Sequence, residues 1–192
     1  LGNILKELGR LEEAEASYRQ AIKLKPDFIE AHSNLGNTLN NLGRFDEAEV
    51  SYKQAIKLKP NYAKAHYNLG NTFKEQGRPE EAEASYRQAT KLKPDFAEAY
   101  SNLGIMLKEL GRLKEAEASY KEAIKLKPDY ADAHLNLFEL FEKTNRTDEI
   151  LVRARNVYEK VYEKEPDFQF YEALALFRHE NYESAEKLIN KI

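Results

Sequence analysis

The feature that most constrains the fold is a repeat of 34 residues. Prolines recur at this step at Pro26, Pro60, Pro94 and Pro128. The same step joins three further series, which are Gly9, Gly43, Gly77 and Gly111, then Ala14, Ala48, Ala82 and Ala116, then Tyr18, Tyr52, Tyr86 and Tyr120. A period of this length is typical of stacked supersecondary units whose neighbours share a core. Such arrays usually work through an extended surface.

Each repeat reads as two helices joined by a turn. In residues 29–62, Ala31, Leu35 and Leu39 follow the helical spacing of one apolar face. Gly43 can adopt the left-handed conformation that ends a helix, and Pro60 prevents the second helix from continuing. We therefore predict an all-α fold, an α-α superhelix or solenoid of stacked antiparallel helix pairs.

Small residues and charges support the helix pair. We expect Gly36 to face Ala48 and Ala55, so that the two helices approach closely. Four ion pairs at i,i+4 spacing have the polarity that suits a helix, at about 0.2–0.5 kcal/mol each. They are Glu15–Arg19, Glu49–Lys53, Glu83–Arg87 and Glu117–Lys121.

The repeat divides the chain into units. We predict a truncated unit at 1–28, because the chain opens at Leu1 within a repeat and without Met, and full units at 29–62, 63–96 and 97–130. A degenerate unit follows at 131–168, where the step to Pro166 is four residues longer and predicts a second helix one turn longer. There Phe138, Asn145 and Ile150 replace small residues, which should splay the pair. Residues 169–192 form either a capping helix pair or a junction with a further domain.

The series Leu-Gly, Gly, Ala, Tyr, Ala and Pro at this spacing resembles the tetratricopeptide repeat family. The resemblance is strong over residues 1–130 and weaker beyond. It implies a superhelix whose first helices line a concave groove for peptides or proteins. The segments SNLGN and IKLKPDF are most similar to the repeat arm of the O-linked N-acetylglucosamine transferases and their bacterial relatives.

Asparagines form the sharpest candidate site. A first row stands two residues before the repeated glycine or its replacement, at Asn34, Asn68, Asn102 and Asn136. A second row stands one residue after it, at Asn3, Asn37 and Asn71. We expect both rows on the face turned away from the second helix. An amide matches the C=O and N–H of a peptide bond, so the rows predict a ladder that holds an extended peptide by its backbone. The similar transferase arm has such a ladder. The alternative is that these side chains bond neighbouring helix ends within the stack.

Further groove residues are predicted at Lys64, Tyr67, Lys74 and Lys108. The flanking slots mix both charge signs, so we expect modest selectivity or simply a solvated face. A second resemblance concerns the chaperone-binding members of the family, which grip a terminal carboxylate. Asn3, Asn34 and Lys64 fit three of those positions, but Asn68 stands where that clamp has arginine.

The sequence offers no enzyme motif. No nucleophile triad, phosphate loop or HExxH pattern occurs, and there is no cysteine. His32, His66 and His134 share one repeat slot with Tyr100, which indicates packing rather than metal binding. The net charge of −3, with interspersed Lys and Glu, does not favour a nucleic-acid partner. No stretch is long and apolar enough to span a membrane.

We therefore predict a non-enzymatic scaffold that binds a protein or peptide in its groove, without metal or cofactor. The alternative is the substrate-recruiting arm of a larger enzyme, such as a glycosyltransferase, sulfotransferase or hydroxylase. We also predict a cytoplasmic location, since a chain without cysteine suits a reducing compartment. Weak self-association is expected through the ends of the solenoid.

Overall fold

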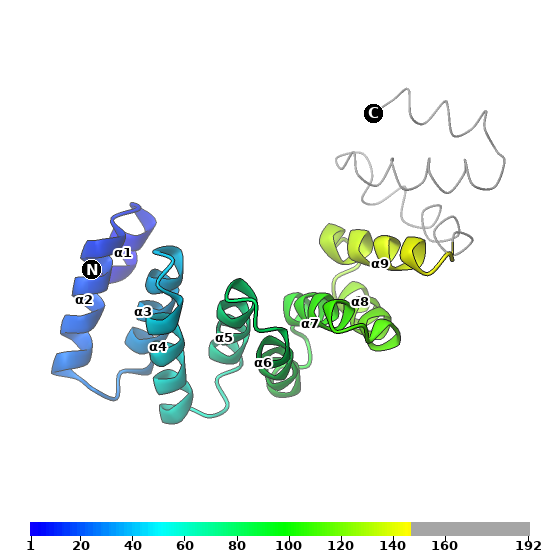
Figure 1. The fold of residues 1–192 in the computed structure, drawn as a ribbon. Helices are drawn as coiled ribbons and strands as arrows, with labels where there is room; N and C mark the ends of the chain where they lie inside the picture. The colour runs from blue at the N-terminus through cyan, green and yellow to red at the C-terminus, as the bar shows by residue number, and fades with distance from the viewer. Residues whose placement is uncertain (147–192) are drawn as a thin grey trace, which may run out of the picture.

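The helices stack side by side in one curved row, in sequence order (Figure 1). A computed structural model describes residues 1–146, and these residues form helices and no strand. The elements are α1 (Gly2–Glu7), α2 (Leu11–Leu24), α3 (Ile29–Asn41), α4 (Phe45–Leu58), α5 (Ala63–Glu75), α6 (Pro79–Leu92), α7 (Ala97–Glu109), α8 (Leu113–Leu126) and α9 (Ala131–Lys143). The predicted all-α solenoid of helix pairs is confirmed. None of these helices is long and apolar enough to cross a bilayer.

The turn inside each pair is set by a residue with positive φ. Gly43 and Gly77 have φ values of 71° and 67°, as the left-handed cap requires. Asn145 replaces this glycine in the unit that begins with α9, and it keeps the same conformation at φ 57°. The substitution therefore preserves the backbone of the turn. The predicted longer second helix, the splayed pair and the unit at 169–192 all lie outside the described residues.

Tyrosine fills the space between the paired helices. We expected Gly36 to face Ala48 and Ala55, but its nearest neighbour on α4 is the ring of Tyr52. A Cβ atom at Gly36 would lie 2.7 Å from Cε1 of that ring, which is too close for any real contact. The same contact recurs between Gly70 and Tyr86. Glycine is needed here because an aromatic ring, rather than a second small residue, packs against the backbone.

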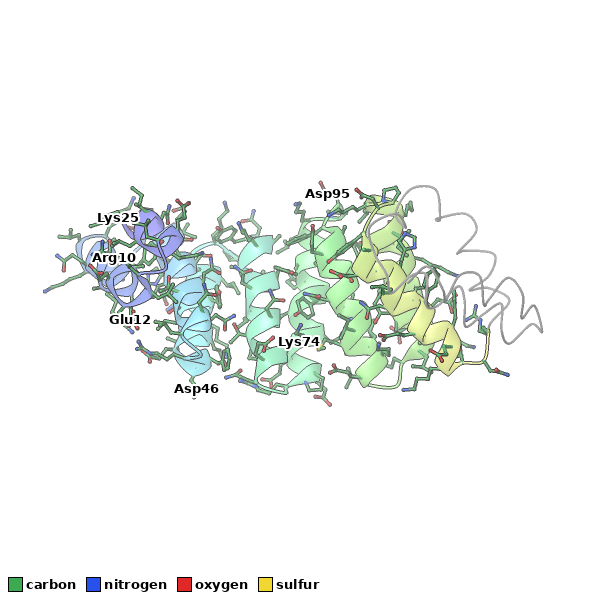
Figure 2. The ribbon with its side chains drawn as sticks, turned by 90° about the horizontal axis from the view of Figure 1, so that it is seen from above. Arg10, Glu12, Lys25, Asp46, Lys74 and Asp95 are labelled. Carbon is green, nitrogen blue, oxygen red and sulfur yellow. The ribbon has the colours of Figure 1, made fainter. Side chains whose placement is uncertain are left out.

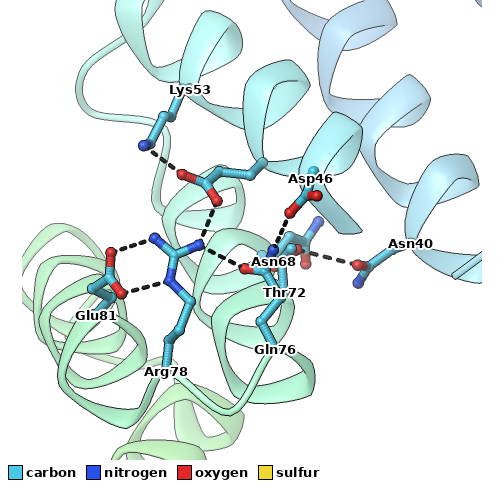
Figure 3. A network of polar contacts seen from close by, with 9 residues as sticks. Asn40, Asp46, Lys53, Asn68, Thr72, Gln76, Arg78 and Glu81 are labelled. Atoms are coloured by element: carbon cyan, nitrogen blue, oxygen red, sulfur yellow. Dashed lines mark hydrogen bonds and ion pairs between the residues drawn. The ribbon is translucent and has the colours of Figure 1, made fainter. Parts of the chain in front are cut away.

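A charge network joins the second helices of successive pairs. The carboxylate of Glu49 accepts hydrogen bonds from Lys53 Nζ at 2.6 Å and from Arg78 Nη1 at 2.7 Å. Figure 3 shows Arg78 between these groups and Glu81, with which it also pairs. The four predicted i,i+4 pairs are all present, and an arginine from the next unit joins each of them. The network thus links units as well as turns of one helix.

Glu49 makes stability depend on pH. Burial alone would raise the pKa of its carboxyl, but the hydrogen bonds from Lys53 and Arg78 outweigh burial and lower it. A lowered folded pKa stabilises the protein above the ordinary pKa, and this contribution is lost as pH falls through the folded value. We expect Glu49→Gln to lower the free energy of unfolding at neutral pH by about 1–2 kcal/mol. The difference from wild type should shrink on acidification, as followed by circular dichroism melts. Glu12→Gln, at an exposed position on α2, is the control and should change little.

The first unit exposes apolar side chains that later units bury. Ile4 is 60% exposed, whereas Thr38, one repeat later, is fully buried. Leu1 and Leu8 extend this stripe along α1 at 84% and 65% exposure. Self-association through this end stays a prediction. We expect Ile4→Lys to abolish concentration-dependent association in sedimentation velocity, because a charge would replace the apolar contact. A wild-type chain that stays monomeric at high concentration would contradict it.

Candidate functional site: an asparagine-lined groove

Two adjoining hollows lie along the first helices of the pairs. The first has a volume of about 330 Å³ and is lined by Lys6, Asn37, Asn40, Asn41, Tyr52, Lys64, Asn68 and Asn71. The second has a volume of about 460 Å³ and is lined by Asn40, Phe45, Tyr67, Asn71, Lys74, Glu75 and Asn102. They share Asn40 and Asn71, so together they form one polar groove across α1, α3, α5 and α7. Figure 2 shows Lys74 among the side chains that project from the stacked helices.

Hydrogen bonds fix the asparagines of this groove. The oxygen of Asn37 accepts one bond from the Tyr52 hydroxyl at 2.7 Å and another from Nδ2 of Asn68 at 2.7 Å. One repeat later, Asn71 accepts from Tyr86 at 2.7 Å and from Asn102 at 3.1 Å. The first unit repeats the pattern, since Asn3 accepts from Tyr18 and Asn34. We call each such set a Tyr–Asn–Asn relay.

The relay changes two expectations from the sequence. The second asparagine row does not lie wholly away from the second helix, because Asn37 bonds Tyr52 of α4. The reason is the close Gly36 contact, which brings the tyrosine hydroxyl through to the groove side of α3. Asn34, Asn68 and Asn102 of the first row do bond within the stack, but to a side-chain amide of the preceding unit rather than to a helix end. Asn136 makes no such bond, because Ile105 stands at the partner position. The asparagines of the relay thus form hydrogen bonds that join neighbouring units.

The relay leaves part of each amide available to a ligand. The oxygen of Asn37 is used twice, and none of the hydrogen bonds of residues 1–146 uses its NH2 group. Asn68 contributes one N–H, which leaves its oxygen as an acceptor. Both side chains are only partly buried. The relay therefore orients donors in the second row and acceptors in the first.

Ile105 interrupts the series in α7. It stands where Asn37 and Asn71 stand in the preceding units, and it offers no acceptor. The hydroxyl of Tyr120, which would bond an asparagine here, is buried with no hydrogen-bond partner. Burial raises the pKa of Tyr120, as expected for a phenol that water does not reach. Among residues 1–146, the relay is thus complete over the first three pairs and incomplete in the fourth.

The structure brings some of the predicted site residues together and separates others. Asn37, Asn68, Asn71 and Lys64 line the first hollow, and Tyr67, Lys74, Asn71 and Asn102 line the second. Four predicted residues lie outside both hollows. Asn3 and Asn34 border a smaller cavity of about 230 Å³ beside Leu1 and Phe28, and Lys108 forms an ion pair with Glu139 at 2.7 Å. Asn136 lines neither hollow.

Sequence reasoning missed the tyrosine hydroxyls and the interrepeat arginines. Both the tyrosines and the arginines recur every 34 residues, and this recurrence was the feature of the sequence that could have indicated them. The sequence also puts Lys6, Asn40 and Asn41 at flanking positions of mixed charge. These flanking positions were expected along the groove, and all three line the first hollow.

The repeated histidines hold the turns between units. The Nε2 atoms of His32, His66 and His134 lie 2.8, 3.0 and 3.0 Å from the carbonyl oxygens of Pro26, Pro60 and Pro128. Each contact spans six residues and ties the start of a first helix to the preceding turn. The histidines at this repeat position, for which packing was predicted, therefore each contact a specific backbone carbonyl oxygen. Across residues 1–146, no group of three or more His, Asp or Glu residues is placed to hold a metal ion.

The relay predicts opposite effects at equivalent positions. Asn71→Ala would leave the buried Tyr86 hydroxyl without its acceptor, so we expect a loss of about 1–3 kcal/mol in the free energy of unfolding. Ile105→Asn supplies the acceptor that Tyr120 lacks and should raise stability. Tyr120→Phe should be neutral or stabilising, whereas Tyr86→Phe should not. Thermal melts of the four variants test this, and equal effects of the two Tyr→Phe changes would contradict the relay.

Comparison with known proteins identifies the repeat. One family model, described as "TPR repeat", matches residues 2–43 and 36–77, and a second, described as "Tetratricopeptide repeat", matches residues 67–131, 107–149 and 153–192. Curated proteins gave no match.

Solved structures of several repeat proteins share the fold. The pilF protein of Pseudomonas aeruginosa has a TM-score of 0.82 at 21% identity, covering 98% of this chain and 85% of its own. MamA has a TM-score of 0.74 at 22% identity, covering 96% and 97%. YrrB, described as a TPR protein with an unusual peptide-binding site, has a TM-score of 0.74 at 21% identity, covering 91% and 89%. The family matches span most of the sequence, and the chain therefore belongs to the tetratricopeptide repeat family.

Proposed function

We propose that this chain is a non-catalytic scaffold that binds an extended peptide or protein segment in the asparagine-lined groove. The observation that carries the proposal is the orientation of the amides by the relay. Asn37 presents an NH2 group and Asn68 an oxygen, side by side on adjacent helices. A peptide backbone offers the complementary C=O and N–H groups.

The spacing of the units suits an extended chain. Packed helices lie about 8–10 Å apart, and an extended strand advances about 3.3 Å per residue. One repeat unit therefore corresponds to about three residues of the ligand. Each amide contact contributes about 0.5–1.5 kcal/mol, so several units in series are needed for useful affinity. Because the contacts are to the backbone, they tolerate many ligand sequences.

The aromatic groups of the second hollow add apolar contact. The Tyr67 ring packs on Phe96 at a centroid distance of 4.7 Å, and its hydroxyl accepts a hydrogen bond from Asn102 at 3.2 Å. The ring is thus held in place at the edge of the groove. A fixed aromatic surface binds a ligand side chain at low entropic cost. The peptide-binding site described for YrrB, a protein of the same fold, also supports a peptide ligand.

The alternative is a substrate-recruiting arm of a larger enzyme. The asparagine rows resemble those of the O-linked N-acetylglucosamine transferase arm, and that resemblance is what favours this alternative. In either case the groove would bind protein rather than nucleic acid or membrane, and a cytoplasmic location remains our prediction. A full reading frame that encodes a catalytic domain would favour the alternative.

A peptide selection followed by affinity measurement tests the proposal. The full chain is used to select binders from a random dodecapeptide library displayed on phage, and one binder is labelled for fluorescence anisotropy. We expect Asn68→Ala combined with Asn102→Ala to weaken binding about tenfold, since two amide contacts disappear. Asn61→Ala, at an exposed position between α4 and α5, is the control and should bind as wild type.

A second measurement separates backbone recognition from side-chain recognition. Methylation of single backbone nitrogens in the selected peptide should weaken binding at positions about three residues apart. Failure to select any peptide would overturn the proposal. Unchanged affinity of the Asn68→Ala, Asn102→Ala variant would show that binding occurs elsewhere.

A further inference from the structure

We propose that the first hollow of the groove selects an acidic side chain, Asp or Glu, in the bound peptide. This inference rests on the proposed peptide-binding function and adds a specificity to it. The occupant is a carboxylate carried by an extended peptide, seated between Lys6 of α1 and Lys64 of α5.

The composition of the first hollow favours an anion. Its lining contains two lysines, five asparagines and one tyrosine, and no carboxylate. Among the ion pairs of residues 1–146, none involves Lys6 or Lys64. Both ammonium groups are therefore open to a ligand. On the second helices, by contrast, Lys53 and Lys121 are each paired with a glutamate of the same helix.

The second hollow, by contrast, contains side chains of both charge signs. In the second hollow Lys74 is accompanied by Glu75, and further along Lys108 is paired with Glu139. The sequence alone predicts flanking slots that mix both charge signs evenly. The structure separates them, because the helical offset between positions 6 and 7 places Lys6 in the hollow while Glu7 is not part of its lining. The first hollow thus has lysines and no carboxylate in its lining, whereas the lining of the second has one of each.

The amides complete the site for a carboxylate. The NH2 group of Asn37 lies in the same hollow as the two lysines, and its oxygen is already committed to Tyr52 and Asn68. A carboxylate accepts hydrogen bonds only, so it uses this donor without competing for the oxygen. Charge-assisted hydrogen bonds of this type are stronger than neutral ones. A basic side chain at the same place would face two ammonium groups and be repelled.

The position of the hollows also predicts a register. They share Asn40 and Asn71 and are displaced by one unit, which equals about three residues of extended peptide. The acidic residue should therefore stand about three positions from a residue that contacts Tyr67 and Phe45 of the second hollow. That second residue is expected to be apolar or aromatic.

Peptide selection with charge variants tests the inference. The full chain, a Lys6→Gln, Lys64→Gln variant and a Lys6→Glu, Lys64→Glu variant are each used to select from a random dodecapeptide phage library. We expect enrichment of Asp or Glu at one aligned position with wild type, loss of that enrichment with the Gln variant, and enrichment of Lys or Arg with the Glu variant. Affinity of a wild-type binder should fall about tenfold in the Gln variant at low salt, and the difference should narrow at high salt. Lys57→Gln, an exposed change on α4 outside the groove lining, is the control and should behave as wild type.

The outcomes separate this inference from the proposed function. If peptides are selected without acidic enrichment, or if acidic enrichment survives in the Glu variant, the acidic specificity is wrong and the backbone ladder stands. If wild type selects no peptide, the groove function fails and the specificity fails with it. Melting temperatures of all variants, compared with wild type, show that each binding comparison is made on folded protein.

Discussion

The close contact between a glycine and a tyrosine ring in each helix pair is the constraint on which the other features depend. A Cβ at Gly70 would lie 2.7 Å from the ring of Tyr86, so no other residue fits without displacing it. The contact also sets where the tyrosine hydroxyl lies, since the ring passes beside the first helix and its hydroxyl reaches Asn71 on the groove side. The same glycine–tyrosine contact thus determines both the packing of the core and the position of the hydroxyl that bonds the groove asparagine.

The asparagines consequently serve stability and binding with different atoms. The oxygen of Asn37 satisfies a buried phenol and a neighbouring amide, while its NH2 group stays on the groove side. If these residues served only the surface, alanine would be favoured at their positions, because it is the better helix former. Had they only a core role, they would be fully buried rather than partly exposed. Hydrogen bonding within the stack orients the amide in advance, which lowers the entropy lost on binding a ligand.

The 34-residue period was enough to predict the helix pairs, the left-handed turns and the i,i+4 ion pairs, because each depends on residues close in sequence. The details of the groove depend on contacts between units, such as Arg78 to Glu49 and Asn68 to Asn37. Those contacts require the relative rotation of stacked helices, which periodicity does not give. The same limit explains why the ring of Tyr52 against Gly36 was not predicted, although small residues suggested a close approach of the two helices there.

The interruption at Ile105 bears on whether the relay serves folding alone. In that pair the Tyr120 hydroxyl is buried without a partner, and α7 and α8 nevertheless pack around Gly104 as their counterparts do. A complete relay is therefore not required to form a helix pair. Both groove hollows lie where the relay is complete, and each contains Asn71, whose oxygen accepts from Tyr86 and Asn102. At Asn37 and Asn71 such a substitution would leave a buried tyrosine hydroxyl without its acceptor, so folding also favours the relay there. Asn37, Asn68, Asn71 and Asn102 belong both to the relay and to the lining of the hollows, so the amides that bond within the stack are also the amides that a ligand would meet.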